Sequence, residues 1–297
     1  MSAVDPSEAL PDVLTVPDLP ATDRGEGANL GKRVSAARPP FALRGGFLSL
    51  ATILLVLLAW WLAASLRLVP PLFLPSPEAV LAKFVAVWRE GYVDATLPSH
   101  LLASVGRVFG ALAGAAVVGV PMGLAIGLSP FARGVIDPLL EFVRPIPPLA
   151  YLPLVVIWVG IGEASKLLVI GLAMLAPIAI STATGVRAVS RERVNAARAL
   201  GASGGQVIRH VVLPSALPGI LTGLRIALGA GWSTVVAAEL IGARAGLGFM
   251  IQSASQYLAT DIVVMGILVI AAVAFALEAT LRWLERRFVP WAGRVGG

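Results

Sequence analysis

The sequence has 297 residues, of which 57% are hydrophobic and 13% are charged, and its mean hydropathy is +0.86. This composition is too apolar for an ordinary soluble domain. The absence of cysteine excludes disulfide scaffolds and cysteine nucleophiles, and the two histidines, His100 and His210, are too far apart to indicate a metal cluster. The net charge of +6 comes without an aromatic-interleaved basic patch, so it indicates membrane topology rather than nucleic-acid binding.

Residues 1–45 are predicted to be a disordered cytoplasmic tail. Six prolines stand there among scattered acidic residues, and no apolar periodicity is present. A secretory signal would begin with a basic end and a short apolar run, whereas this chain begins with Asp5 and Glu8. We therefore expect no such signal. At the other end, residues 286–297 are predicted to be a short cytoplasmic tail.

Six apolar runs have about the 20 residues that a bilayer-crossing helix needs. They are predicted to span the membrane at 47–66, 101–128, 138–160, 167–183, 217–241 and 262–283. The third run contains RPIPPLAYLP, whose prolines remove backbone donors and prevent a regular helix. Irregular backbone at membrane depth must be shielded by protein or wetted by a cavity, so this run is expected to face inward. The predicted fold class is all-α, a polytopic membrane protein with six transmembrane helices.

Two shorter features accompany these runs. Ser76, Pro77 and Glu78 form a typical helix start, which predicts a helix over 76–88 on the outer surface. With the first span, this helix makes up a predicted segment 46–96. Near the end of the last span, Glu278 precedes Arg282 by four residues, the favourable order for an ion pair along one helix.

Glycines recur at every fourth position in two of the spans. The positions are 106, 110, 114, 119, 123 and 127 in the second span and 219 and 223 in the fifth. Small residues at this spacing make a flat strip, against which another helix can pack closely in lipid. We therefore expect these strips to be helix–helix contacts, with smooth faces that can also slide.

The basic residues predict the orientation of the chain. If both termini are cytoplasmic, fifteen Lys and Arg residues lie on the inner side and five on the outer side, and three fall within spans. Cytoplasmic loops are enriched in basic residues, so this arrangement is strongly favoured over its inverse. The largest internal cytoplasmic loop is then 187–214, between the fourth and fifth spans.

This loop is predicted to form two short helices. The first is expected from Arg191 to Leu200, and Gly201 follows in the position where a helix ends in the left-handed conformation. Ser203 and Gln206 have the spacing of a capping box that opens the second helix. Pro214 is expected to end that helix before the fifth span.

The loop resembles the EAA loop of ABC-importer permeases. Two alanines, a glycine four residues after the second, and a Leu-Pro pair ending thirteen residues after the glycine match that pattern; they are Ala196, Ala197, Gly201, Leu213 and Pro214. The segments 144–166 and 222–252 are similar to the sulfonate, nitrate and taurine branch, and 259–270 and 286–294 are most similar to its taurine permeases. The resemblance starts at about residue 71.

The resemblance implies an ABC type I importer transmembrane-domain fold over residues 97–285 and a homodimeric pore in the bacterial inner membrane. Two ATPase subunits would each grip one loop through Asn195, Ala196, Ala197, Leu200, Gly201, Leu213 and Pro214, and a periplasmic binding protein would deliver the substrate. Asn195 replaces the family's usual glutamate and would offer a weaker contact. The sequence contains no Gly-x-x-x-x-Gly-Lys-Ser/Thr loop, so ATP and magnesium are expected on the partner ATPase and no cofactor or metal on this chain.

The expected cargo is taurine or a related alkanesulfonate. Candidate residues of the substrate path are Trp232, Ser233, Thr234, Glu239 and Arg144. Hydroxyl donors and a cation suit a sulfonate, and a carboxylate suits the ammonium group of taurine. The alternatives are a nitrate, bicarbonate or thiamine-precursor permease of the same branch, or a stand-alone secondary transporter, although no ion relay or inverted repeat is visible. An intramembrane enzyme is disfavoured because paired carboxylates, Ser-His pairs and metal ligands are lacking.

Overall fold

The computed structural model describes residues 42–288, which are almost entirely helical. The predicted tails fall mostly outside this range, although residues 42–45 belong to the first helix. The elements are α2 (Ala42–Ser65), α3 (Pro77–Arg89), α4 (Leu97–Leu128), α5 (Pro130–Val143), α6 (Pro148–Val159), α7 (Glu163–Arg187), α8 (Arg191–Ala199), α9 (Gly204–Val207), η1 (Ile208–Val212), α10 (Leu213–Glu239), α11 (Leu247–Gln256) and α12 (Thr260–Phe288).

Internal contacts divide the chain into two units, residues 1–56 and 57–297. The described part of the first unit is the beginning of α2. Its large apolar side chains, such as Leu50, Ile53 and Leu54, are exposed in the single chain, as lipid-facing side chains would be. The second unit holds the rest of the fold.

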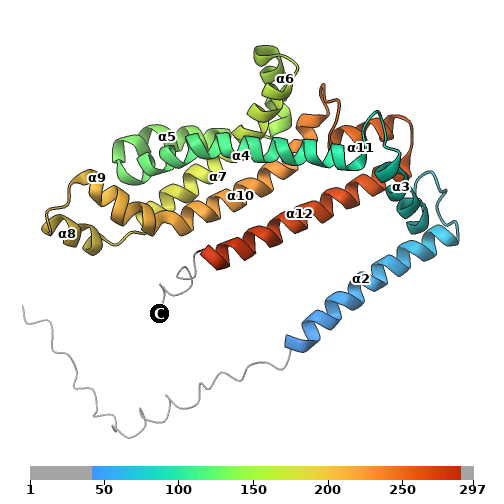
Figure 1. Ribbon diagram of the computed structural model, residues 1–297, viewed down its shortest axis with the longest axis horizontal. Helices are drawn as coiled ribbons and strands as arrows, with labels where there is room; N and C mark the ends of the chain where they lie inside the picture. Colours follow the sequence, from blue (N-terminus) through green and yellow to red (C-terminus); the bar gives the residue numbers. More distant parts are fainter. Residues whose placement is uncertain (1–41, 289–297) are drawn as a thin grey trace, which may run out of the picture. The chain divides into compact units, whose positions relative to one another are not determined.

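Five helices are long and apolar enough to cross a membrane, and the pair α5 and α6 is a sixth crossing if counted as one broken span. The prediction of a single third span is corrected, because α5 and α6 meet at an angle of 104° and α6 projects from its neighbours (Figure 1). Pro145 and Pro147 stand in the break, where they prevent helical hydrogen bonding. The predicted second and fourth spans are helices that qualify as membrane spans by length and hydropathy, and they extend a few residues further, to 97–128 and 163–187.

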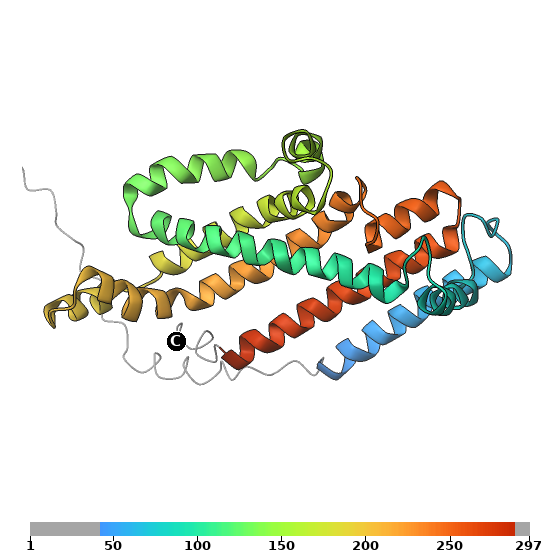
Figure 2. The ribbon, with the colours of Figure 1, turned by 45° about the horizontal axis from the view of Figure 1, so that its top comes forward.

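Helix α7 is the centre of the second unit and packs along both α4 and α10. Val169, Ile170, Met174 and Ile178 on α7 are fully buried. Helix α12 lies beside α3 and α11, and turning the molecule shows that it runs back toward the end that carries α8 and α9 (Figure 2). The core is therefore a bundle of long helices whose side chains, rather than a sheet, fill the interior.

The predicted glycine contacts are confirmed in part. At Gly123 a Cβ would collide with the carbonyl oxygen of Ala179 and with Thr182 on α7, and Gly119 and Gly127 are similarly tight. Glycines 219 and 223 of α10 also approach α7 closely. The prediction is wrong for positions 106 and 114, where a Cβ would meet nothing within 4 Å. The tight contacts with α7 are thus at Gly119, Gly123 and Gly127, whereas Gly110 meets Leu167 of α7 only at ordinary van der Waals distance.

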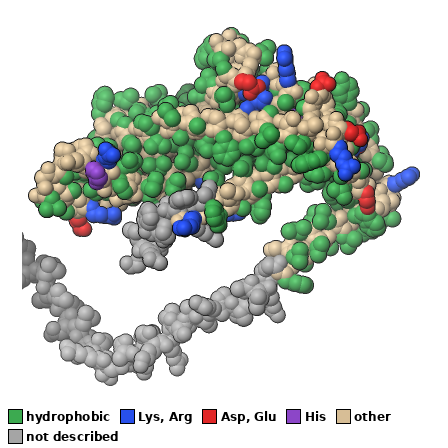
Figure 3. Space-filling model, viewed as in Figure 1, with side chains coloured by type: hydrophobic (Ala, Val, Ile, Leu, Met, Phe, Trp, Pro, Cys, Tyr) green, Lys and Arg blue, Asp and Glu red, His purple; other side chains and the backbone are tan. Residues whose placement is uncertain are grey.

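Charged side chains are unevenly distributed on the second unit. They gather around α8 and α9 at one end, around α3 and α11 at the other, and near the base of α6, while the surfaces between are largely hydrophobic (Figure 3). The apolar band coincides with the four helices of this unit that qualify as membrane spans.

Candidate functional site

The segment between α7 and α10, residues 188–212, contains the predicted helix pair and is called the α8–α9 segment. The helix α8 ends one residue before its prediction, and Gly201 follows with φ of +84°, the left-handed region expected for it. The predicted capping box is confirmed: Gln206 donates its backbone N–H to Ser203 Oγ at 3.4 Å, and the Ser203 backbone N–H reaches Gln206 Oε1 at 2.8 Å.

The predicted helix end at Pro214 is wrong. The chain passes from α9 through the π-helical turn η1 into α10, so that 204–239 is one continuous helix. In the π turn the Leu213 N–H bonds to the carbonyl of Ile208, five residues back. This wider turn gives the ring of Pro214 room that an α-helical turn lacks. A continuous helix therefore joins the α8–α9 segment to the apolar, membrane-spanning part of α10.

The α8–α9 segment is anchored on one side and free on the other. Val194 and Ala197 pack against a cluster that contains the buried Val207 and Val212. Leu200 is 90% exposed beside Gly201, where a Cβ would meet no atom within 4 Å. Asn195, Ala196, Leu213 and Pro214 are exposed as well. The structure thus presents Leu200, whose side chain is far more exposed than Ile208 or Leu213, beside small residues.

The predicted substrate-path residues do not form one site. Thr234 is buried and donates its hydroxyl to the carbonyl of Ala230 at 2.8 Å. Arg144 is exposed at the α5–α6 break. Glu239 is fully buried and engaged by other protein groups. Contacts of these three residues with a substrate stay predictions.

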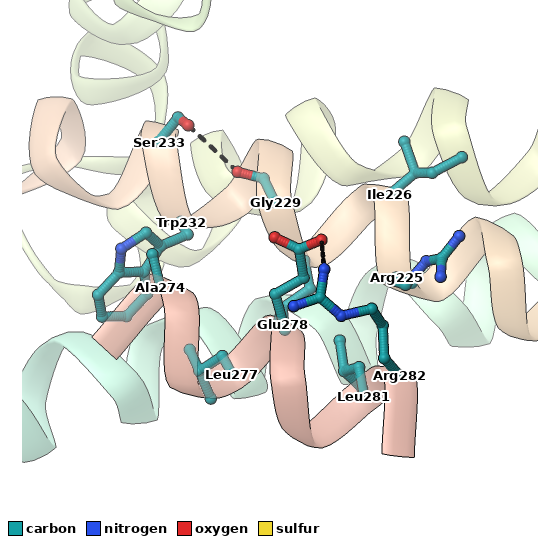
Figure 4. Close-up of a pocket in the computed structure, with 11 residues that line it drawn as sticks. Arg225, Ile226, Gly229, Trp232, Ser233, Ala274, Leu277, Glu278, Leu281 and Arg282 are labelled. Carbon is teal, nitrogen blue, oxygen red and sulfur yellow. Dashed lines mark hydrogen bonds and ion pairs between the residues drawn. The ribbon is translucent and has the colours of Figure 1, made fainter. Parts of the chain in front are cut away.

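Trp232 and Ser233 do share a cavity, which we call the α10–α12 cleft. It has a volume of about 490 Å³ and is lined by residues of both helices (Figure 4). Arg225 lines it from α10, and Glu278 and Arg282 line it from α12. The predicted ion pair along α12 is confirmed, since Arg282 Nη1 donates to Glu278 Oε1 at 2.9 Å. The cleft therefore holds charges of both signs beside an aromatic wall.

A second group of charges lies where α4, α7 and α10 meet, and all of its members except Glu163 are buried. Arg107 of α4 donates Nε and Nη2 to the two carboxylate oxygens of Glu163 at 2.7 and 2.8 Å, and Nη1 to Glu239 Oε1 at 2.6 Å. Lys166 Nζ donates to Glu163 Oε1 at 3.0 Å. Two cations and two carboxylates make this ionic cluster electrically neutral. Among the described residues, no three His, Cys, Asp or Glu side chains converge as metal ligands.

The loop before α11 is bonded to this cluster. Glu239 also accepts the hydroxyl of Ser104 at 2.7 Å and the backbone N–H of Gly248 at 2.8 Å. His100 Nδ1 accepts the N–H of Gly246 at 3.1 Å, so Nε2 carries the proton and donates to the Tyr92 carbonyl at 2.9 Å. Every polar group of this network is satisfied within the chain, which is the condition for burying charge.

A family model described as "Binding-protein-dependent transport system inner membrane component" matches residues 99–290. The chain belongs to this family. It is therefore a membrane component of an ABC transporter, and its fold class is the predicted one.

Individual relatives agree with this assignment. The "Taurine transport system permease protein TauC" of Escherichia coli (strain K12) is 56% identical over 249 residues, which cover 84% of this chain and 90% of that protein. The "Putative aliphatic sulfonates transport permease protein SsuC" of the same strain is 36% identical over 80% of this chain and 88% of its own. The membrane chain in an inward-facing structure of the MetNI methionine ABC transporter shares the fold, with a TM-score of 0.56 at 20% identity over 62% of this chain and 92% of that one.

Sequence reasoning predicted the Glu278–Arg282 pair but missed the ionic cluster and the position of Arg225 beside that pair. From the sequence, Arg107 and Arg225 are recognisable only as charges within spans, and Glu163 and Lys166 lie in no motif. A membrane-embedded carboxylate or guanidinium is a reason to look for a buried partner. However, sequence spacing does not identify the partner of a buried charge when the two residues lie on different helices.

Proposed function

We propose that this chain is the permease subunit of a binding-protein-dependent ABC importer that moves taurine or a related alkanesulfonate into the cytoplasm. The observation that carries the proposal is the 56% identity with the E. coli taurine permease over most of both chains. The 36% identity with an aliphatic sulfonate permease supports the same chemical class of cargo.

The α8–α9 segment is the proposed coupling element. Leu200 would enter a groove of the ATPase, and the small residues Ala196, Ala197 and Gly201 would let the walls of that groove close around it. Asn195, Leu213 and Pro214 would complete the contact. Because η1 continues directly into α10, a push on the segment would be transmitted along one helix into the membrane. The ATP and magnesium chemistry would reside on the ATPase, since this sequence has no phosphate-binding loop.

The proposed assembly contains two copies of this chain, two ATPase subunits and a periplasmic binding protein in the bacterial inner membrane. Both termini and the α8–α9 segment would face the cytoplasm. The distribution of basic residues supports this orientation, with fifteen Lys and Arg on that side and five on the other.

The experiment is uptake of radiolabelled taurine into proteoliposomes that contain the permease and its ATPase, with binding protein outside and ATP inside. We expect uptake that stops when ATP is omitted, even when an ion gradient is imposed. The variant Gly201→Asp should abolish uptake while the permease remains at its normal level in the membrane. Uptake driven by an ion gradient alone, or full uptake and ATPase co-purification with Gly201→Asp, would refute the proposal.

A further inference from the structure

The α10–α12 cleft contains more charge than packing requires. Arg225 lies twelve residues into α10, inside the segment that qualifies as a membrane span. Glu278 and Arg282 line the same cleft from the end of α12 (Figure 4). Charged side chains within spans are costly to insert and are candidates for a substrate or ion pathway. A ligand that carries both a negative and a positive group would find partners for each in this cleft.

The geometry leaves donors available. The recorded Arg282–Glu278 hydrogen bond at 2.9 Å uses one of the five N–H donors of that guanidinium. Ser233 is exposed and its hydroxyl donates at 3.2 Å to the carbonyl of Gly229, a bond that a rotation about χ1 can exchange for another acceptor. Planar guanidinium groups bind oxyanions such as sulfonate through paired N–H donors.

The walls of the cleft are shaped for a small molecule. The indole N–H of Trp232 is held by the Ile270 carbonyl at 3.2 Å, which fixes the ring as one wall. At Gly229 a Cβ would meet no atom within 4 Å, so the cleft is open at this point. A volume of about 490 Å³ is ample for a two-carbon zwitterion and its water.

We propose that the α10–α12 cleft binds the transported alkanesulfonate, with the sulfonate held by Arg225 and Arg282 and the ammonium group of taurine facing Glu278. This inference rests on the proposed function, because it takes its ligand from there. The pairing of cations with a carboxylate matches a small zwitterion better than it matches a purely anionic ligand, because Glu278 has no cationic partner on the latter.

The test uses the purified permease–ATPase complex in nanodiscs of phosphatidylcholine, without binding protein, and measures equilibrium binding of radiolabelled taurine. We expect saturable binding by the wild type. The variant Gly229→Leu should weaken it by about tenfold or more, because the new side chain fills the cleft. The matched control is Gly134→Leu in α5, where a Cβ also meets nothing within 4 Å but which does not line the cleft, and binding should be unchanged.

Charge variants separate the contacts. Arg225→Gln should lose binding and Arg225→Lys should recover part of it. Glu278→Gln should weaken binding of taurine but not the ability of ethanesulfonate, which has no ammonium, to compete. Co-purification of the ATPase verifies that each variant assembles.

Two results would overturn the inference. One is equal taurine binding by the wild type and Gly229→Leu. The other is loss of taurine binding when phosphatidylglycerol is added to the nanodiscs, which would make the cleft a lipid site. If the wild type transports taurine in proteoliposomes and either result is found, the inference alone fails. If the wild type does not transport taurine, the proposed function fails with it.

Discussion

Arg107 of α4 donates its Nη1 proton to Glu239 Oε1 of α10 across 2.6 Å, and the two residues are 132 positions apart in sequence. Both side chains are buried, with exposed fractions of 8% and 0%. The same guanidinium grips Glu163 at the start of α7, whose carboxylate is more than half exposed. One arginine therefore ties together the three helices that make up the core of the unit, at the end away from the α8–α9 segment (Figure 2).

Removal of the buried carboxylate should destabilise this end of the bundle. Glu239→Ala leaves Arg107 short of a partner and the Gly248 N–H without its acceptor. We expect a loss of about 3–5 kcal/mol of unfolding free energy, because an uncompensated charge remains buried. The measurement is thermal or denaturant unfolding of the complex in detergent, with the exposed Glu90→Ala as control. Equal stability of the two variants would contradict the structural role given to the ionic cluster.

Close packing of α4 on α7 predicts a position-dependent effect of glycine substitutions. Gly123→Val should be destabilised by about 1–3 kcal/mol or fail to fold, since its Cβ would collide with Ala179 and Thr182. Gly114→Val on the same helix meets open space and should retain the stability of the single chain. Unfolding curves of the two variants check this, and a reversed order would show that the helices are packed differently.

The start of α3 predicts a pH effect. The pKa of Glu78 is lowered, first by a hydrogen bond from its own backbone N–H and then by Ser76 and Trp61, whose indole donates at 2.6 Å. A lowered folded-state pKa means that these bonds contribute stability above the ordinary glutamate range and lose it as the pH falls through the folded pKa. The difference in melting temperature between wild type and Glu78→Gln should therefore shrink as the pH falls below about 4. A difference that stays constant into strong acid would rule out this contact.

The left-handed backbone at Gly201 predicts an order among its substitutions. With φ at +84° and no atom near a Cβ, the penalty is conformational rather than steric. Gly201→Asn should keep most of the ATP-driven uptake, because asparagine tolerates this region, whereas Gly201→Val should lose it. Uptake and ATPase co-purification are measured for both variants. Equal activity of the two would show that the left-handed backbone at Gly201 is not needed for coupling.

Side-chain contacts within one helical turn were predictable from the sequence, and contacts between distant helices were not. The capping box of Ser203 and Gln206 and the pair of Glu278 and Arg282 were predicted because their partners lie within one helical turn. The apolar runs likewise predicted all the spans except the third, which is broken between α5 and α6. The meeting of Arg107 with Glu239 depends on how α4 and α10 are packed, which no spacing encodes. At Pro214 the rule that proline ends a helix was overridden by the π-helical turn before it.

The position of the α8–α9 segment relative to the membrane is the most direct test of the account. The chain has no cysteine, so Leu200→Cys, at a side chain that is 90% exposed, gives a unique label site. Tyr257→Cys, 78% exposed beside α11 at the other end of the bundle, is its control. A membrane-impermeant maleimide should label residue 200 in inside-out vesicles and residue 257 in right-side-out vesicles. Labelling of residue 200 from the periplasmic side would contradict the account, because no ATPase could reach the segment there.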